Sequence, residues 1–80
     1  MLNFEFGRAL EIFKTNVTTL SEADEVLKNL RMYFPSCRIN FDLHDCDRIL
    51  RVEGKACEIN IDRILKIVAD QRFEIELIKE

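Results

Sequence analysis

Hydrophobic and polar residues alternate in four segments of the chain, with the period of two that is typical of a β-strand buried on one face. These segments are residues 10–17, 37–43, 49–53 and 73–78, and Gly54 is expected to end the third. The core-facing positions in these segments are predicted to be Phe13, Thr15, Val17, Cys37, Ile39, Phe41, Leu43, Leu50, Val52, Phe73, Ile75 and Leu77.

Apolar residues recur every three or four positions in two other segments, as in helices with one buried face. The first helix is expected over about residues 22–33, with Ser21 as its N-cap and Pro35 as its stop. The second helix follows Asn60, whose side chain can cap the first turn. The expected buried stripes are Ala23, Val26, Leu27, Leu30 and Phe34, and then Ile61, Ile64, Leu65 and Val68.

The order strand, helix, strand, strand, helix, strand fits few arrangements, because crossover connections are right-handed. We therefore predict an α+β fold, the ferredoxin-like βαββαβ sandwich, with both helices on one face of a four-stranded antiparallel sheet. A chain of 80 residues is long enough for one such core, so residues 1–80 are expected to form a single domain. Residues 10–78 would form the core, and residues 1–9 an extension or an extra edge strand.

Composition and charge narrow the classes of partner. The chain carries 12 basic and 15 acidic residues, a formal charge of -3, and the two signs alternate without forming a basic stripe. We therefore expect no nucleic-acid partner, since phosphate binding requires clustered positive charge. No apolar run approaches the roughly 18 residues that span a bilayer, so no membrane association is expected.

Three cysteines, Cys37, Cys46 and Cys57, are an odd number at spacings that match neither a close metal pair nor a disulfide framework. They favour a reducing compartment. The first residues, MLNFEFGRAL, lack the basic and apolar regions of a secretory signal. We therefore expect a cytoplasmic protein. Cys37 falls on an inward-facing position, and Cys57 lies at the end of the sheet opposite to Cys46.

The open face of the predicted sheet is mostly charged but carries isoleucines. The N-terminal Leu2, Phe4 and Phe6 also alternate, and alternate apolar residues outside a core need something to cover. They could pair as an edge strand in the same chain or in a partner. The predicted interaction surface comprises Phe4, Phe6, Ile12, Ile49 and Ile78, and the expected partner is another protein or a second copy of the chain.

The turn His44-Asp45-Cys46-Asp47 offers a different chemistry. In the predicted topology it lies at the same end of the sheet as Glu22 and Asp70. An imidazole, a thiolate and several carboxylates could hold zinc, copper or another divalent ion, with His44 and Cys46 as the principal ligands. The His-x-Cys spacing is not a zinc signature, and the alternative interpretation is that these polar residues only solvate a tight turn.

Three segments of the sequence carry a resemblance to a known family: FKTNV, INFDLHDCDRILRVEG and QRFEIELI. Together with the order of elements, they resemble a heavy-metal-associated domain of the copper-chaperone type. The resemblance covers about 65 of the 80 residues. Members of that family carry a methionine and Cys-x-x-Cys around the start of the first helix. The resemblance places Val17, Thr19 and Glu22 at those positions, so it implies the fold without the family's metal-binding motif.

An enzyme is not expected, because the single histidine has no nucleophile placed beside it in a known motif and no glycine-rich phosphate loop is present. Two further classes share the order of elements. Amino-acid-binding regulatory domains have a glycine-rich ligand loop that is missing here. RNA-recognition domains stack bases on sheet aromatics, but Phe41 is expected to face the core. The sequence thus favours a non-enzymatic protein-interaction or dimerisation module without a cofactor, with metal binding at residues 44–47 as the alternative.

Overall fold

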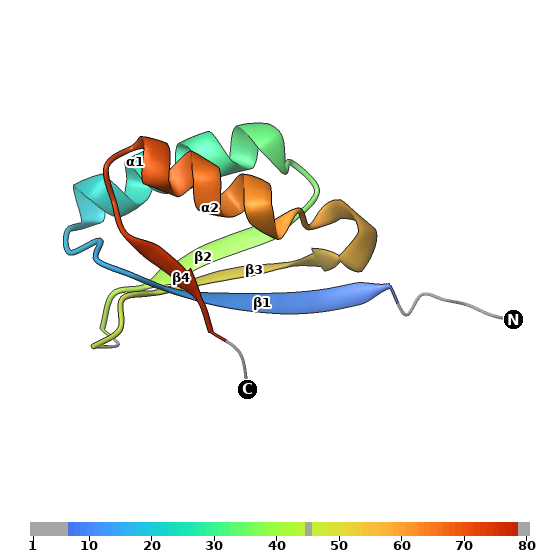
Figure 1. The fold of residues 1–80 in the computed structure, drawn as a ribbon, viewed down its shortest axis with the longest axis horizontal. Helices are drawn as coiled ribbons and strands as arrows, with labels where there is room; N and C mark the ends of the chain where they lie inside the picture. Colours follow the sequence, from blue (N-terminus) through green and yellow to red (C-terminus); the bar gives the residue numbers. More distant parts are fainter. Residues whose placement is uncertain (1–6, 45, 79–80) are drawn as a thin grey trace, which may run out of the picture.

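A computed structural model describes residues 7–44 and 46–78 of the chain (Figure 1). Its elements follow the predicted order. They are β1 (Arg8–Thr15), α1 (Leu20–Tyr33), β2 (Arg38–Asp42), β3 (Ile49–Lys55), the 3-10 turn η1 (Ala56–Glu58), α2 (Ile61–Asp70) and β4 (Ile75–Leu77). No helix within the described part of the chain is long and apolar enough to cross a lipid bilayer.

The four strands form one antiparallel sheet in the order β2-β3-β1-β4, and this arrangement confirms the predicted ferredoxin-like fold. Both helices pack on one face of the sheet, and no helix of the described residues lies over the opposite face (Figure 1). β2 and β4 are therefore the edge strands. At the β2 edge, the guanidinium of Arg31 donates a hydrogen bond to the Ile39 carbonyl over 2.9 Å.

The core lies between the sheet and the helices, as the alternation predicted. The fully buried side chains include Phe13 and Val17 from the first strand and its loop, Leu50 and Val52 from β3, and Val26, Leu30, Ile64 and Val68 from the helices. Thr15 is the buried polar residue of this layer, and its hydroxyl donates to the Arg48 carbonyl over 2.7 Å. That bond ties the end of β1 to the turn before β3.

Several predicted boundaries were wrong. β1 begins at Arg8 and ends at Thr15, so it starts inside the segment assigned to an N-terminal extension. β3 continues through Gly54 to Lys55, because the pairing with β1 extends to Arg8 opposite Lys55. β4 has three residues where six were expected. β1 is consequently much longer than the strand on its outer side.

The start of the first helix also differs from the prediction. α1 begins at Leu20 with Thr19 as its N-cap, whereas Ser21 was expected to cap a helix starting at residue 22. Thr19 prevails because Glu22 stands three residues later and completes a capping box, which satisfies two backbone donors reciprocally. The predicted cap of the second helix was confirmed: the Asn60 side chain caps α2 by accepting from the Arg63 N–H at 3.0 Å.

Three connections meet at one end of the sheet, as predicted. The Thr15 N–H donates to the Asp47 carbonyl over 3.2 Å, which joins β1 to the turn between β2 and β3. Asn16 accepts at its side chain from the Glu74 N–H over 2.8 Å, which joins the loop after β1 to the segment before β4. The candidate metal-binding residues are distributed around this end.

Candidate functional site

The loop where the resemblance would place two cysteines contains a closed hydrogen-bond network. The Thr19 hydroxyl oxygen accepts from the Glu22 N–H at 3.1 Å. In return, Glu22 Oε1 accepts from the N–H groups of Thr18 and Thr19 at 3.1 Å and 3.3 Å. The Thr18 hydroxyl also donates to the same oxygen at 3.3 Å. Both matched positions are therefore engaged in starting the helix.

The Glu22 carboxylate is stabilised in its charged form by these donors. The backbone hydrogen bond from Thr18 is the largest influence, and it lowers the pKa of Glu22 below its usual value. A single carboxylate whose oxygen already accepts three hydrogen bonds is a poor substitute for two soft thiolates. The chemistry of this loop supports helix capping and not copper(I) binding.

His44 and Cys46 are both exposed at the turn between β2 and β3. The His44 N–H donates to Asp42 Oδ1 over 3.2 Å, while its imidazole makes no hydrogen bond or ion pair with the described residues. The carboxylates expected nearby have other partners. Asp47 lies 4.0 Å from Lys14 Nζ, and Asp70 lies 3.6 Å from Lys66 Nζ.

The residues proposed as metal ligands are thus not brought together as a set in the part of the chain that the structure describes. Within residues 7–44 and 46–78, no three histidine, cysteine or acidic side chains are placed to hold a metal ion. Asp45, which was part of the expected cluster, lies outside the described residues. Metal binding by His44 and Cys46 stays a prediction.

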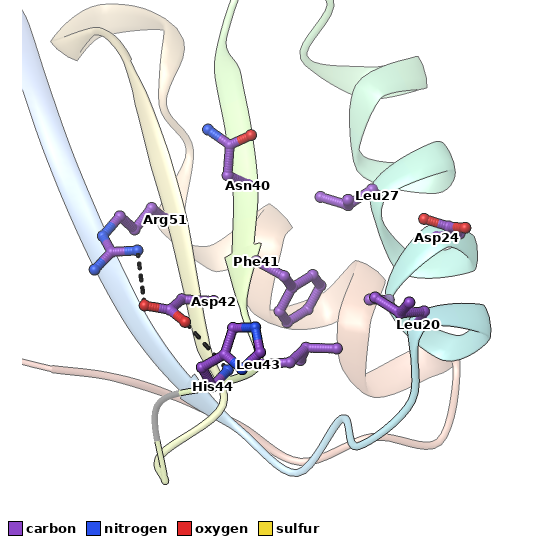
Figure 2. A pocket seen from close by; sticks show the side chains of 10 residues that line it. Leu20, Asp24, Leu27, Asn40, Phe41, Asp42, Leu43, His44 and Arg51 are labelled. Atoms are coloured by element: carbon purple, nitrogen blue, oxygen red, sulfur yellow. Dashed lines mark hydrogen bonds and ion pairs between the residues drawn. The ribbon is translucent and has the colours of Figure 1, made fainter.

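A groove of about 410 Å³ runs between α1 and β2. Figure 2 shows Leu20, Leu27 and Asp24 on the helix side and Phe41, Leu43 and His44 on the strand side. At the end of β2, the Asp42 carboxylate accepts a hydrogen bond from the His44 N–H and forms an ion pair with Arg51 Nη1 at 3.7 Å. Leu20 remains 76% exposed at the rim, and the sequence had placed it in a loop.

The open face of the sheet carries the exposed apolar residues of the strands. Leu10 is 52% exposed and Ile78 is 37% exposed, with the half-buried Ile12 between them. The Ile78 N–H donates to the Ile12 carbonyl over 2.8 Å, so these residues are direct neighbours. We call Leu10, Ile12 and Ile78 the apolar patch.

Ile49 belongs to the same face but differs in its exposure. It pairs with Lys14 on one side and with Asp42 on the other, which sets it on the face opposite to the helices. Only 6% of it is exposed. The ion pairs of Lys14 with Asp47 and of Arg51 with Asp42 lie around it. Ile49 can therefore pack beneath the residues of a contact surface, but it offers little exposed area to a partner.

Sequence reasoning identified Ile12 and Ile78 but missed Leu10, which is the most exposed member of the apolar patch. The signal was present, since Leu10 alternates in phase with Ile12 and Lys14. The predicted strand began at Leu10, so its outward position was not used. Phe4 and Phe6, the other two residues of the predicted interaction surface, lie outside the described residues.

Cys37 and Cys57 have different surroundings. Cys37 is half-buried beside the core, and burial raises the pKa of its thiol, with a further contribution from the negative charge of Glu58. Cys57 is exposed in η1. The raised pKa makes Cys37 a poor nucleophile and metal ligand at neutral pH, in accord with its expected structural role.

The geometry of the sheet also disfavours the RNA-binding alternative. Phe41 pairs with Leu50, a fully buried residue, so its ring lies on the helix side of the sheet, as predicted. The described residues of the open face include no aromatic side chain on which a base could stack.

Comparison of the chain with protein-family models, with curated proteins and with solved structures found no match.

Proposed function

We propose that this protein is a non-enzymatic protein-interaction module whose contact surface is the open face of the sheet, centred on the apolar patch. Exposed apolar residues scattered singly are normal on a protein surface, but adjacent ones rimmed by charge mark contact sites. The observation that carries the proposal is the adjacency of Leu10, Ile12 and Ile78 on a face that neither helix covers.

The charges around the patch favour a protein partner of mixed character. Arg8 lies 3.8 Å from Glu53 at one side of the patch, and Arg51 lies 3.7 Å from Asp42 at another. These pairs are more than one-third exposed, so they can exchange partners at little cost. An apolar centre with a polar, charged rim is the usual anatomy of a protein interface.

The resemblance to a heavy-metal-associated domain supports the fold and a loss of the family's metal role. The two positions matched to its cysteines form the capping box of α1. A domain that has kept its architecture and replaced its ligands is suited to binding through its surface. We place this activity in the cytoplasm, because the odd number of unpaired cysteines favours a reducing compartment.

The proposal is tested by site-specific photo-crosslinking in the cells that make the protein. A photoreactive amino acid is introduced at Ile78 on the open face, and at Lys66 on the exposed side of α2 as the matched control. We expect a discrete adduct, with another protein or with a second copy, from position 78 and not from position 66. The Leu10→Asp variant should abolish that adduct while the thermal unfolding of the chain stays close to native.

Equal labelling from both positions, or an adduct that survives Leu10→Asp, would contradict the assignment of the contact surface. The same experiment separates this proposal from metal binding at residues 44–47. An adduct that depends on His44 and Cys46 but not on Leu10 would move the functional site to the turn between β2 and β3.

A further inference from the structure

The main-chain groups of β2 alternate between the neighbouring strand β3 and the outer edge of the sheet. The Ile39 carbonyl shows the phase of this alternation, because it accepts from the guanidinium of Arg31, which belongs to α1. In an antiparallel pair, each residue directs its N–H and its C=O to one side, and the next residue directs both to the other side. Ile39 and Phe41 therefore face the outer edge, while the even-numbered residues of β2 bond to β3.

Two arginine side chains occupy the carbonyls on either side of Phe41. Arg31 donates to the Ile39 carbonyl over 2.9 Å, and Arg48 Nη1 donates to the Leu43 carbonyl over 2.8 Å. The N–H and C=O of Phe41 have no hydrogen-bond partner in the described part of the chain. We call these two groups the Phe41 window. One edge residue with a free donor and a free acceptor can form both bonds of a single antiparallel bridge.

The Phe41 window lies beside the groove between α1 and β2. The Phe41 ring points into this groove, and Leu20 and Leu27 point into it from the helix (Figure 2). Directly opposite residues of two paired strands point their side chains to the same face, so a side chain opposite Phe41 would enter the groove. The volume of about 410 Å³ is within the range of about 300–1,000 Å³ that is usual for ligand sites. The groove therefore has room for aliphatic side chains of a paired strand.

The undescribed ends of the chain are attached far from this groove. Residues 1–6 precede Gly7, about 22 Å from Phe41 along the sheet, a distance that six residues barely span when fully extended. Residues 79–80 follow β4, which is about 14 Å from β2, and two residues span at most about 7 Å. Neither end can both reach the groove and fill it.

The charges in the groove favour a basic partner. Asp24 lines the helix side of the groove, and its carboxylate has no hydrogen bond or ion pair among the residues that the structure describes. On the strand side, Asp42 adds a second carboxylate, which is paired with Arg51 at 3.7 Å. A lysine or arginine placed beside Asp24 would gain an ion pair, whereas an acidic residue there would be repelled.

We propose that this groove binds an extended segment of another protein, which pairs antiparallel with β2 at Phe41. An aliphatic residue of the segment lies opposite Phe41 and bonds to both groups of the Phe41 window, with its side chain in the groove near Leu27. Main-chain hydrogen bonds at a sheet edge supply affinity in such complexes, and pockets for alternate side chains supply specificity. This surface is separate from the apolar patch, so the inference goes beyond the proposed function.

The position of Asp24 sets where the basic residue of the segment lies. Arg31 near the end of α1 contacts Ile39 at the middle of β2, so Asp24, two turns earlier, lies toward the Leu43 end of the groove. In an antiparallel segment, the residue two positions before the aliphatic one lies at that end and on the same face. The segment is therefore a lysine or arginine, then any residue, then an aliphatic residue.

A second copy of the chain is a poorer occupant of the groove. If two β2 strands paired about Phe41, Ile39 of each copy would lie opposite Leu43 of the other. The carbonyls of both residues already accept from Arg31 and Arg48, so only the bonds of the Phe41 window would form. A separate segment brings a free carbonyl that also accepts from the Ile39 N–H. The main-chain groups thus favour a different protein.

Amide hydrogen exchange of the native chain, measured by NMR, tests the Phe41 window. The Phe41 N–H should exchange at least about tenfold faster than the Asn40 N–H, which bonds to β3. Equal protection of the two amides would show that the window is already filled, and this result would overturn the proposal.

Selection from a display library of random octapeptides identifies the segment. We expect the native chain to enrich peptides with a lysine or arginine two positions before an aliphatic residue. Asp24→Lys should change that preference to aspartate or glutamate. Glu25→Lys is the matched control, because Glu25 is the next residue of α1 and does not line the groove, and it should keep the basic preference. No enrichment, or a preference that Asp24→Lys leaves unchanged, would overturn the proposal.

N-methylated forms of the enriched peptide test the main-chain bonds. A methyl group on the nitrogen of the aliphatic residue removes the donor to the Phe41 carbonyl and should weaken binding about tenfold. Methylation of the following residue is the control, because its N–H points away from β2. Equal effects of the two methyl groups would contradict the pairing. Leu10→Asp should leave the affinity unchanged, and a loss of binding in that variant would place the peptide on the open face instead.

Discussion

Gly54 and Cys37 are in close contact: a Cβ atom added to Gly54 would lie 3.0 Å from the Sγ atom of Cys37 and 3.4 Å from its Cα atom. Gly54 is inside β3, where it pairs with Ala9. Cys37 is the residue directly before β2, the strand on the other side of β3. The glycine was expected to end the strand. Its role is instead to make room for the thiol in the space beside the core.

Gly54→Ala should therefore destabilise the fold by about 1 kcal/mol, since the thiol must move by a few tenths of an ångström to admit the methyl group. Urea unfolding of the single variants and of the Gly54→Ala, Cys37→Ala pair would measure the coupling. We expect the pair to recover most of the loss that Gly54→Ala causes alone. Strictly additive effects would show that the two side chains do not compete for space.

Alkylation should distinguish the three thiols. Cys37 is half-buried with a raised pKa, so little of it is thiolate at pH 7.5, whereas Cys46 and Cys57 are exposed. We expect iodoacetamide to modify Cys37 last, and its rate to keep increasing as the pH is raised above 9. Peptide mapping at timed intervals measures this order. Early labelling of Cys37 in the folded chain would contradict it.

The capping box predicts unequal effects for two neighbouring hydroxyl residues. Thr19→Ala removes the side chain that accepts from the Glu22 N–H and should cost about 1 kcal/mol of unfolding free energy. Ser21→Ala is the matched control, because Ser21 lies one residue inside α1 and should change stability by less than about 0.5 kcal/mol. A larger loss at Ser21 would identify it as the true cap.

Glu22 should make the stability depend on acid pH. Its folded-state pKa is lowered, chiefly by the Thr18 N–H, so its stabilising effect is complete above the unfolded value of about 4.3 and is lost as the pH falls through the folded pKa. The difference in stability between the native chain and Glu22→Gln should therefore be constant near pH 7 and shrink below about pH 4. Thermal unfolding between pH 3 and pH 7 tests this, and a difference that grows in acid would refute it.

The alternative metal site gives a separate prediction. If His44 and Cys46 hold zinc or copper(I), the reduced chain should bind one ion in competition with a chelator, and the His44→Ala, Cys46→Ser variant should not. Affinity should decrease below about pH 6.5, because imidazole and thiol must lose protons to bind a metal. Binding that the double variant retains, or that does not change with pH, would exclude these ligands.

Periodicity predicted the layers of the fold because the buried face of each element must be apolar whatever the details of its ends. The ends follow from interactions that a pattern alone ranks poorly. Thr19 and Ser21 are both good caps, and only the reciprocal bond of Glu22 to the Thr19 N–H decides between them. A Thr-x-x-Glu motif was visible in the sequence and could have indicated the correct start.

The candidate contact surface was predicted in part, for a similar reason. Alternation identified Ile12, Ile49 and Ile78 as outward-facing, but Ile49 is buried on that face, between its partners Lys14 and Asp42 on two neighbouring strands. The short β4 was also not predicted, because the alternation of residues 73–78 is longer than the stretch that pairs with β1. Neither property is encoded in any single segment.

The bond from Arg31 to the Ile39 carbonyl limits how far sheets of this protein can grow. β2 is an edge strand of the sheet, and there a side chain of α1 already occupies a main-chain acceptor. A strand added along the whole of β2 would have to displace that guanidinium. This border of the sheet is thereby guarded against the edge-to-edge stacking of chains that builds fibres.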